Sequence, residues 1–596
     1  MRRRKNPVAF GRYILMGGLL GAVMLGLSGR AAYLQLWVDQ DLQQKGNAYH
    51  LRDRVMPARR GLILDRNGEP LAVSTPMLTV TADPQVLLQK ENRRNWRALA
   101  RQLGLSRADL QKRILHFKNK NFVVLKRGMR PAQLEKFAPA LRQLITVQKQ
   151  YRRYYPTAAA AAQVVGFTDI RDRGQVGIEA YYNRQLAGQD GSKRVIVDTQ
   201  RRAVEDVEQL AAVQHGQNLK LSLDARIQST AYQALRATVI KFQAASGSVV
   251  VLDVRTGEIL AMANMPDFNP NVIAQRRSER FRNRSVTDLF EPGSTIKPLL
   301  VETALEARLV TPDTRIETSP GTMRIGNSTI HDVSDHGLLT VAQVLIKSSN
   351  IGAAKIGLKM PAKQIRRAYD RAGIGHQTNS GLPGEARGIL PNRKRWKPIE
   401  HASMAFGYGF MLTPLQLARL YAGIANAGSM PTPTIFKRSQ DAPVKQIMLP
   451  AMARRLALIL EKVTEPGGTA LAAATPLYRV AGKTGTTQLL INGSYRSGRY
   501  DSIFAGFGPV SQPRLVTVVV VRDPRRGGYY GGTVAAPVFS QVMSESLRLL
   551  NVAPDKVVAS KPASLVQRQA VPVNPYSVAR QAVPVNPYTV SPRKAS

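Results

Sequence analysis

Apolar residues dominate one long stretch near the beginning of the chain. Residues 13–29 contain no charged side chain, and after Arg30 the apolar run continues through Tyr33 and Leu34 to Val38. A helix needs about 20 mostly apolar residues to span a bilayer, and an arginine near its end can reach the lipid head groups. The pattern therefore predicts one transmembrane anchor over residues 13–38.

The segment before this anchor is basic. Residues 1–12 contain no acid, and their cations are Arg2, Arg3, Arg4, Lys5 and Arg12. Positive flanks stay in the cytoplasm, so we expect this tail inside the cell and the chain after about residue 40 outside the membrane. A cleaved signal peptide is the alternative. Ser28-Gly29-Arg30 makes a poor cleavage site, so we favour an uncleaved, single-pass anchor.

Residues 45–215 have the pattern of a soluble module that mixes strands and helices. Residues 60–73 are typical of a β-hairpin with Asn67-Gly68 at its turn, and helices are expected over residues 93–116 and 131–143. This stretch contains neither a nucleophile–base pair nor a metal-ligand spacing. We expect a non-catalytic pedestal between membrane and active site that offers surfaces to partners.

Residues 216–550 begin and end with strand patterns around a mainly helical middle. Residues 219–223 predict a strand, and Asp224 is the expected N-cap of a helix with an apolar stripe at steps of about four residues. A hairpin is expected over residues 248–263, later strands over 478–486, 503–507 and 515–521, and a final helix over 537–550. This order predicts an α/β (α+β) domain whose antiparallel sheet is built from both ends of the domain and flanked by helices.

The composition changes after residue 551. The twelve residues 568–579 recur almost unchanged as residues 580–591, and both copies are rich in proline. Such repeats bury too little apolar surface to offset the entropy of ordering, so residues 551–596 are expected to be an extended, mobile tail. The tail is either a docking strip for a partner or a dispensable extension.

The charge of the chain is strongly positive. It has 85 Lys and Arg against 40 Asp and Glu, a net charge of +45. Nucleic acid must therefore be weighed as a ligand, but the basic residues are spread along the chain and the sequence has no known nucleic-acid-binding motif. We therefore expect no nucleic acid partner. The basic surface either meets anionic cell-wall polymer and lipid head groups or is simply solvated. The lack of cysteine excludes disulfides, thiolate catalysis and cysteine-based metal sites.

One motif suggests nucleophilic catalysis. Ser294 and Lys297 lie three residues apart, which on a helix places both on one face. Pro292 and Gly293 break the preceding structure and Pro298 is tolerated only near a helix start, so Ser294 is expected at a helix N-terminus. Backbone N–H groups there favour an oxyanion, and a nearby base can turn a serine hydroxyl into a nucleophile. Alone, Ser-x-x-Lys is common and is usually a solvated helix face.

Two further motifs follow in the order that penicillin-interacting serine enzymes use. They are Ser348-Ser349-Asn350 and Lys483-Thr484-Gly485-Thr486. Three ordered motifs of this kind are typical of penicillin-binding proteins and class A β-lactamases, and the chain resembles that superfamily. A cation such as Lys483, together with burial, would lower the pKa of Lys297 and allow it to act as a base. The oxyanion hole is expected to use the backbone N–H groups of Ser294 and Thr486.

The chain more specifically resembles the division-specific class B penicillin-binding proteins of Gram-negative bacteria, the FtsI type. The resemblance rests on Phe-Glu-Pro-Gly-Ser-Thr-Ile-Lys-Pro at residues 290–298, on residues 406–419 and on Tyr-Tyr-Gly-Gly at 529–532; residues 60–68 and 152–156 resemble N-terminal motifs of the same class. It covers the chain from the anchor to about residue 550 and implies a peptidoglycan D,D-transpeptidase without a cofactor. It also implies an inner-membrane protein whose catalytic domain lies in the periplasm at the division septum.

The resemblance implies a role for each motif residue. Ser294 would attack the carbonyl of the penultimate D-alanine of a donor stem peptide and hold the peptide as an ester, which an amine of a neighbouring stem then accepts. Lys297 would be the general base, and Ser348 and Asn350 would line the cleft, passing protons and binding the peptide amide. Lys483 and Thr486 would bind the terminal carboxylate, Gly485 would let their strand approach the ligand closely, and Thr484 would also bind the substrate. β-Lactams would acylate Ser294, and an FtsW-type glycosyltransferase and other divisome membrane proteins would be partners.

Several alternatives remain open at this stage. The same motifs serve D,D-carboxypeptidases and β-lactamases, which differ in delivering water to the acyl-enzyme. An elongation-type transpeptidase is a closer alternative, and a receptor or scaffold with a silent site is a more distant one. His331, Asp332, Asp335 and His336 are spaced as if for a metal, but neighbours on a loop are more often solvated, and we expect no metal site. The basic run over residues 276–284 either attracts anionic substrate or forms a solvated rim.

Overall fold

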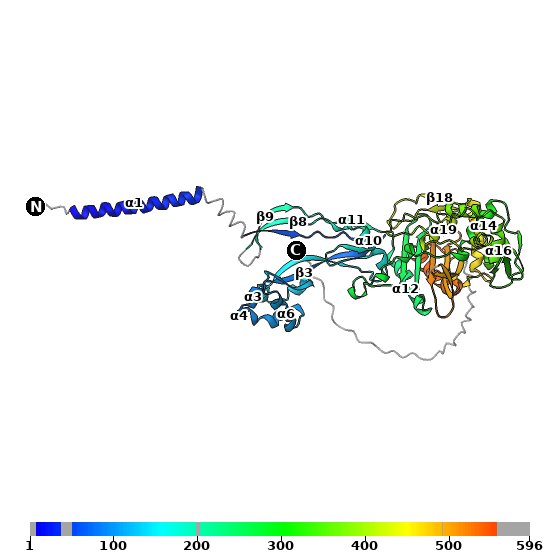
Figure 1. The fold of residues 1–596 in the computed structure, drawn as a ribbon, viewed down its shortest axis with the longest axis horizontal. Helices are drawn as coiled ribbons and strands as arrows, with labels where there is room; N and C mark the ends of the chain where they lie inside the picture. Colours follow the sequence, from blue (N-terminus) through cyan, green and yellow to red (C-terminus); the bar gives the residue numbers. More distant parts are fainter. Residues whose placement is uncertain (1–6, 37–49, 198–202, 492, 557–596) are drawn as a thin grey trace, which may run out of the picture. The chain divides into compact units, whose positions relative to one another are not determined.

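The computed structural model describes residues 7–36, 50–197, 203–491 and 493–556. Residues 2–5 of the basic tail and both proline-rich repeats lie outside the described residues, so the expectations for them stay predictions. The expected anchor falls on α1 (Pro7–Leu36), the one helix of the described chain long and apolar enough to cross a membrane, over Gly11–Gln35 (Figure 1). Its length and composition fit a single-pass membrane anchor.

The N-terminal module contains two sheets. The first is antiparallel and joins β1 (Leu51–Met56), β8 (Gly191–Val197) and β9 (Ala203–Ala211). In the second, β3 (Pro70–Ala82) pairs with β2 (Ile63–Leu64), β4 (Val123–Met129) and β5 (Thr146–Tyr154), and β10 (Leu219–Lys220) lies parallel to β2. The predicted hairpin is confirmed, with Gly68 at the turn in a left-handed conformation of φ +97°.

The helices of this module depart from the prediction in one place. α5 (Trp96–Leu103) and α6 (Arg107–His116) confirm the first helical region and are separated by Gly104 and the N-cap Ser106. The expected helix over residues 131–143 is wrong as one helix. It is two short ones, α7 (Pro131–Leu134) and α8 (Pro139–Arg142), because each begins with a proline that has no N–H to continue a preceding helix.

A buried ion-pair network fastens the smaller elements of the module. Glu179 accepts hydrogen bonds from Arg60 Nε at 2.7 Å and from Arg153 Nε at 2.6 Å, and all three side chains are almost fully buried. Removing one partner would leave an uncompensated buried charge. The short elements around it are α9 (Ala162–Val165), β6 (Phe167–Thr168), β7 (Gly174–Val176), α10 (Gly177–Tyr181) and α11 (Asn183–Ala187). Two further helices, α3 (Pro84–Leu88) and α4 (Lys90–Arg93), belong to a separate cluster with α5 and α6.

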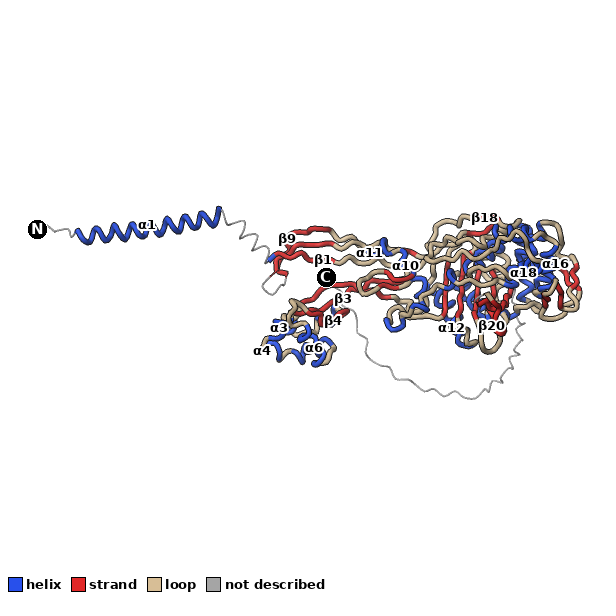
Figure 2. The backbone as a smooth tube through the Cα atoms, viewed as in Figure 1, coloured by secondary structure: helices blue, strands red, loops and turns tan. Residues whose placement is uncertain are grey.

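A five-stranded antiparallel sheet forms the centre of the C-terminal domain (Figure 2). Its order is β12-β11-β21-β20-β19, so the early hairpin and the three late strands meet in one sheet, as predicted. The strands are β11 (Ser246–Asp253), β12 (Ile259–Met265), β19 (Ala481–Ile491), β20 (Ser494–Gly508) and β21 (Leu515–Arg522). β19 begins after the predicted residue 478 because the N–H groups of Tyr478 and Arg479 bond to the side chains of Thr475 and Asp555.

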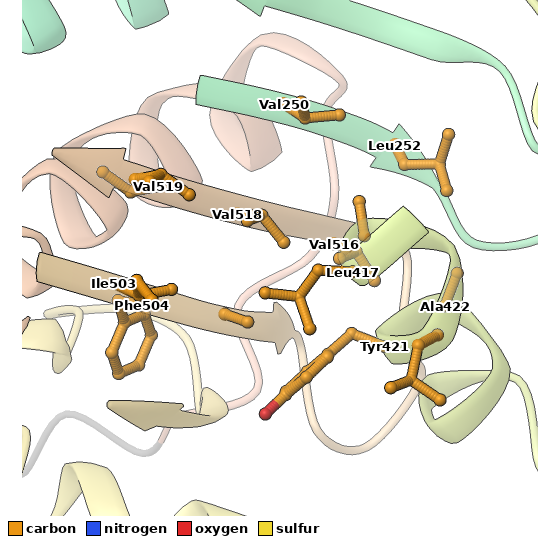
Figure 3. Close-up of a cluster of buried hydrophobic side chains, with 14 of the residues drawn as sticks. Val250, Leu252, Leu417, Tyr421, Ala422, Ile503, Phe504, Val516, Val518 and Val519 are labelled. Atoms are coloured by element: carbon orange, nitrogen blue, oxygen red, sulfur yellow. The ribbon is translucent and has the colours of Figure 1, made fainter. Parts of the chain in front are cut away.

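Helices cover both faces of this sheet. α12 (Ala225–Lys241) and α22 (Ala536–Leu549) pack on one face, and Asp224 caps α12 as expected by accepting from Arg226 N–H. α19 (Pro414–Ala425) packs on the other face, where Leu417 and Tyr421 join the alternate valines of β11 and β21 in one apolar cluster (Figure 3). Close packing of this kind fixes the sheet rigidly.

The remaining elements surround the helical middle of the domain. The helices are α13 (Arg284–Thr287), α14 (Lys297–Glu306), α15 (Val341–Lys347), α16 (Asn350–Leu358), α17 (Ala362–Arg371), α18 (Pro398–Met404), α20 (Pro450–Glu461) and α21 (Gly531–Val534). Short 3-10 helices are η1 (Ile273–Gln275), η2 (Ser278–Arg280), η3 (Gly293–Ile296), η4 (Lys462–Thr464) and η5 (Leu471–Ala473). Three small antiparallel sheets pair β13 (Arg315–Glu317) with β16 (Leu338–Thr340), β14 (Thr322–Ile325) with β15 (Ser328–His331), and β17 (Ser429–Pro431) with β18 (Val444–Gln446).

Candidate active site

Ser294 lies in the 3-10 turn η3, directly before helix α14. Gly293 starts this turn with a left-handed φ of +52°, and a Cβ there would approach Thr487 Cγ2 to 2.3 Å. Ser294 itself is half-buried, and no hydrogen bond to its hydroxyl occurs among the described residues. The expected placement at a helix N-terminus is confirmed, with a tight turn of 3-10 helix as its first part.

The side chain of Lys297 is fully buried at the first residue of α14. Its amine contacts three acceptors, namely Ser348 O at 2.7 Å, Ser349 O at 3.0 Å and Asn350 Oδ1 at 2.8 Å. The first and second sequence motifs therefore meet at one nitrogen atom. An ammonium group can donate to all three acceptors, whereas a neutral amine has only two N–H groups, so one of the three contacts must open before the lone pair of Lys297 is free to take a proton.

The second motif forms the sharp connection between α15 and α16. Ser348 ends α15 in a left-handed conformation with φ +65°, and the hydroxyl of Ser349 caps α16 by accepting from Gly352 N–H at 2.8 Å. The carboxylate of Asp332 accepts from Ser349 Oγ, from Asn350 N–H and from Ile351 N–H at 2.5, 2.5 and 3.1 Å. This turn therefore holds Asn350 in a fixed position beside Lys297.

The third motif lies on β19, whose side chains alternate between the two faces of the sheet. Lys483 is fully buried, and burial lowers the pKa of its amine to about 7. Burial also holds the pKa of Lys297 well below its ordinary value, and the nearby Lys483 lowers it further, whereas Asp332 acts in the opposite direction. Two buried amines close to each other disfavour two protons, so the arrangement favours an unprotonated lysine next to Ser294.

The glycine and threonines of this strand meet the nucleophile turn and a neighbouring loop. A Cβ on Gly485 would lie 3.0 Å from Pro292 O and from Thr295 Cγ2, so glycine allows β19 to approach η3 this closely without displacing either atom. Thr486 Oγ1 accepts from Gly531 N–H at 3.0 Å, and the hydroxyls of Thr484 and Thr469 are 3.1 Å apart. The structure brings all the predicted site residues to one location around η3.

A cavity of about 920 Å³ adjoins these residues. Among its lining residues are Asn350 of the second motif, Gln488 of β19 and the rings of Tyr408 and Tyr495. Glu291 also lines it, and its carboxylate accepts from Gly409 N–H at 2.8 Å and from Tyr495 O–H at 3.0 Å. Burial raises the pKa of this carboxyl group. Sequence reasoning used Glu291 and Tyr408 only as marks of resemblance and assigned them no place in the site.

Asp332 and Asp335 of the cluster at residues 331–336 bond to different parts of the chain, Asp332 to residues 349–351 and Asp335 to Ser319 and Gly337. No group of three or more His, Cys, Asp or Glu side chains that could hold a metal ion occurs among the described residues. Asp332 is a positioning residue for the second motif rather than a solvated loop residue. Its spacing of 17 to 19 residues from its partners leaves no local signal in the sequence.

The basic run before the nucleophile has mainly a structural use. Arg276 lies 4.4 Å from the centre of the Phe167 ring and donates hydrogen bonds to Pro270 O, and Arg282 and Arg284 both pair with Asp288. These contacts hold the segment that leads into η3. The expectation of a merely solvated rim is therefore wrong for Arg276 and Arg284, which are partly buried against these partners, whereas Arg282 is 56% exposed and fits it.

Comparison with known protein families identifies two domains. Residues 247–544 match the penicillin-binding protein transpeptidase domain, and residues 55–221 match the penicillin-binding protein dimerisation domain. The first range contains all three motifs that surround Lys297. The second covers most of the module with the Arg60–Glu179–Arg153 network.

Individual proteins agree with this assignment over nearly the whole chain. The sequence is 38% identical to the peptidoglycan D,D-transpeptidase FtsI of Escherichia coli, over 94% of this chain and 95% of that protein. It is 38% identical to the probable peptidoglycan D,D-transpeptidase PbpC of Pseudomonas aeruginosa, over 92% and 96%.

Solved structures support the same assignment. Penicillin-binding protein 3 of Mycobacterium tuberculosis, solved with aztreonam, has a TM-score of 0.64 at 27% identity and covers 84% of this chain and 98% of its own. The transpeptidase domain of Burkholderia pseudomallei penicillin-binding protein 3 has a TM-score of 0.52 at 41% identity, over 56% and 98%. With its transpeptidase and dimerisation domains and its full-length similarity to FtsI, this chain belongs to the penicillin-binding-protein family of peptidoglycan D,D-transpeptidases.

Proposed function

We propose that this protein cross-links peptidoglycan stem peptides through an acyl-enzyme formed on Ser294. The observation that carries the proposal is the buried amine of Lys297, held between the second and third motifs and directly after the nucleophile turn. A base with a lowered pKa is what a serine hydroxyl needs to become a nucleophile near neutral pH.

The first half-reaction follows from this geometry. Lys297 Nζ takes the proton of Ser294 Oγ while the oxygen attacks the carbonyl carbon of the penultimate D-alanine. The backbone N–H groups of Ser294 and Thr486 stabilise the oxyanion. When the peptide bond breaks, Lys297 returns its proton, through Ser348, to the amine of the leaving D-alanine. The donor peptide then remains as an ester on Ser294.

The second half-reaction reverses these steps with a different amine. An amine of a neighbouring stem peptide attacks the ester carbonyl, and its proton passes to Lys297. The proton then returns to Ser294 Oγ as the ester bond breaks, so the free enzyme is restored and one cross-link has formed. Asn350 orients the peptide amide of the donor in both halves.

The strand of the third motif binds the terminal carboxylate of the donor. Thr486 Oγ1 already accepts from Gly531 N–H, so its own O–H is free to donate to an anion. The Thr484 hydroxyl and the protonated form of Lys483 add a second donor and a positive charge. Gly485 keeps the strand close enough to η3 for this carboxylate and the scissile carbonyl to be held together.

The proposal extends to location and partners. The N-terminal apolar helix, the dimerisation domain and the FtsI relatives support an inner-membrane protein with residues 45–215 and 216–550 in the periplasm, acting at the division septum. An FtsW-type glycosyltransferase and other divisome proteins would be its partners in the membrane.

Intact-mass measurement of the detergent-solubilised chain with benzylpenicillin tests this function. We expect one stable adduct of one penicillin mass, located on Ser294 by peptide mapping and absent from Ser294→Ala. An adduct on another residue would contradict the assigned nucleophile. Rapid release of hydrolysed penicillin would show a β-lactam hydrolase instead of a transpeptidase.

A further inference from the structure

A second hollow, of about 530 Å³, lies next to the active-site cavity. It is lined by Gly498, Arg499 and residues 523–529. Arg499, Arg525 and Arg526 line it together with a single acidic residue, Asp523. Asp523 is almost fully buried and binds Arg499 at 2.6 Å and Arg525 at 2.9 Å. Arg526 has no ion pair among the described residues, so the hollow carries excess positive charge.

Backbone hydrogen bonds hold the loop that carries Arg525 and Arg526. The backbone N–H groups of Arg525 and Arg526 both donate to Phe242 O, at 2.9 and 3.1 Å, and Asp523 N–H donates to Tyr500 O at 2.8 Å. Gly527 and Gly528 then turn the chain with φ values of +75° and +117°. Because the backbone is already held in this way, ligand binding orders the two arginine side chains but costs little backbone entropy.

One wall of the hollow is shared with the active site. The ring of Tyr529 stacks on the ring of Tyr500, with centroids 4.1 Å apart and planes inclined by 12°. Tyr500 lines the 920 Å³ cavity beside Asn350 and Gln488, whereas Tyr529 lines the cationic hollow. The same loop continues to Gly531, whose N–H donates to Thr486 of the third motif. A bound peptide could therefore span both sites.

The chemistry of the hollow selects an anion. Guanidinium groups bind carboxylates in a bidentate, charge-assisted way and retain their charge at every physiological pH. In the proposed reaction the donor's terminal carboxylate already occupies the Lys483–Thr486 strand. The acceptor is a second stem peptide of the same kind, and it also ends in a carboxylate while it presents its amine to the ester on Ser294.

We propose that the hollow formed by Arg499, Arg525 and Arg526 binds a carboxylate of the acceptor stem peptide. This inference rests on the proposed transpeptidase function. It identifies the acceptor's carboxylate as the group by which the enzyme recognises its second substrate. Arg525 and Arg526 are positioning residues: they hold the acceptor so that its amine reaches the acyl ester.

The test compares two acceptors in a transpeptidation assay with a fixed donor. One acceptor is a synthetic stem peptide with a free terminal carboxylate, and the other is the same peptide with a terminal carboxamide. For the wild-type chain we expect the KM of the carboxylate acceptor to be about tenfold lower than that of the carboxamide acceptor. A difference of this size corresponds to the free energy of one charge-assisted hydrogen bond. The double variant Arg525→Gln with Arg526→Gln is expected to lose this preference, with kcat changed far less than KM.

Matched variants separate this effect from a change in fold or charge. Arg454→Gln with Arg455→Gln removes an adjacent exposed pair on α20 and should keep the wild-type preference. Arg526→Gln alone, which breaks no ion pair of the described chain, should weaken the preference even if the double variant fails to fold. Equal preference for the carboxylate in wild type and Arg526→Gln would overturn the proposal. Failure of wild type to form a penicillin adduct would instead contradict the proposed function.

Discussion

The amine of Lys297 lies 2.8 Å from Oδ1 of Asn350, 53 positions further along the chain. The two residues come from different helices, α14 and α16, and each begins its helix. This contact joins the motif that carries the nucleophile to the motif that lines the substrate cleft. The chemistry attributed to Ser294 therefore depends on how well α14, α16 and β19 are held against one another.

Replacing the buried amine tests its role as the base. Lys297→Met is expected to lower the second-order rate constant of penicillin acylation by about 10²- to 10⁴-fold, as the loss of a general base typically does. Stopped-flow or quenched mass spectrometry gives this rate. Lys359→Met, which removes an exposed amine at the end of α16, should leave the rate within about twofold. Equal rates in Lys297→Met and wild type would exclude the assigned role.

Asp332 gives a second prediction, because its carboxylate holds the turn that carries Asn350. Asp332→Asn keeps the shape but replaces one acceptor oxygen with an NH₂ group facing the donors of residues 349–351. We expect a loss of about 1–3 kcal/mol in the free energy of unfolding and slower acylation. Asp335→Asn, on the exposed part of the same loop, is the control. Denaturant unfolding should show a clearly smaller loss in the free energy of unfolding for Asp335→Asn than for Asp332→Asn.

Gly485 gives a third prediction. A methyl group at this position would meet Pro292 O and Thr295 Cγ2 at 3.0 Å and Ile503 Cβ at 3.2 Å, so Gly485→Ala must shift these neighbours or β19 by a few tenths of an ångström. Overpacking of this kind costs about 1–3 kcal/mol and should slow acylation at least tenfold. Gly326→Ala, in a turn with open space around it but a left-handed φ of +58°, is the comparison that adds backbone strain without a steric contact. Acylation at the wild-type rate in Gly485→Ala would show that the strand needs no such close approach.

Glu302 gives a prediction about pH. This residue of α14 is fully buried, and neither carboxyl oxygen has a hydrogen-bond partner among the described residues. Burial raises its pKa from an ordinary 4.5 to about 8, with Glu306 acting in the same direction and Arg371 in the opposite one. The neutral carboxyl group is tolerated in the fold, whereas the ionised one is not.

The sign follows from the raised pKa of the folded state. The stability linked to Glu302 is fully present below about pH 4.5 and is lost as the pH rises towards 8, by about 1.4 kcal/mol for each pH unit. Glu302→Met should therefore raise the free energy of unfolding at pH 8.5 and have little effect at pH 4.5. Urea unfolding at both pH values measures this. The same effect of Glu302→Met at both pH values would contradict the assignment.

Much of the site could be predicted from the sequence because its catalytic and binding residues belong to three short motifs. The structure brings together the residues expected in the site, namely Ser294, Lys297, Ser348, Asn350 and residues 483–486. The spacing of apolar residues also predicted most strands of the central sheet. Contacts between distant residues escaped prediction. Asp332 has no local signal of its three partners, and the cationic hollow joins Arg499 to a loop that begins 24 positions later. Burial and pKa values likewise depend on packing that spacing does not show.

The pH dependence of penicillin acylation tests most directly whether an unprotonated Lys297 activates Ser294. In the wild-type chain we expect the second-order rate constant to stop rising well below pH 10.5, the ordinary pKa of a lysine, because burial and Lys483 lower the pKa of Lys297. A rate constant that still increases about tenfold per pH unit between pH 9 and 10 would show that the amine titrates as an ordinary lysine, and the account would be wrong.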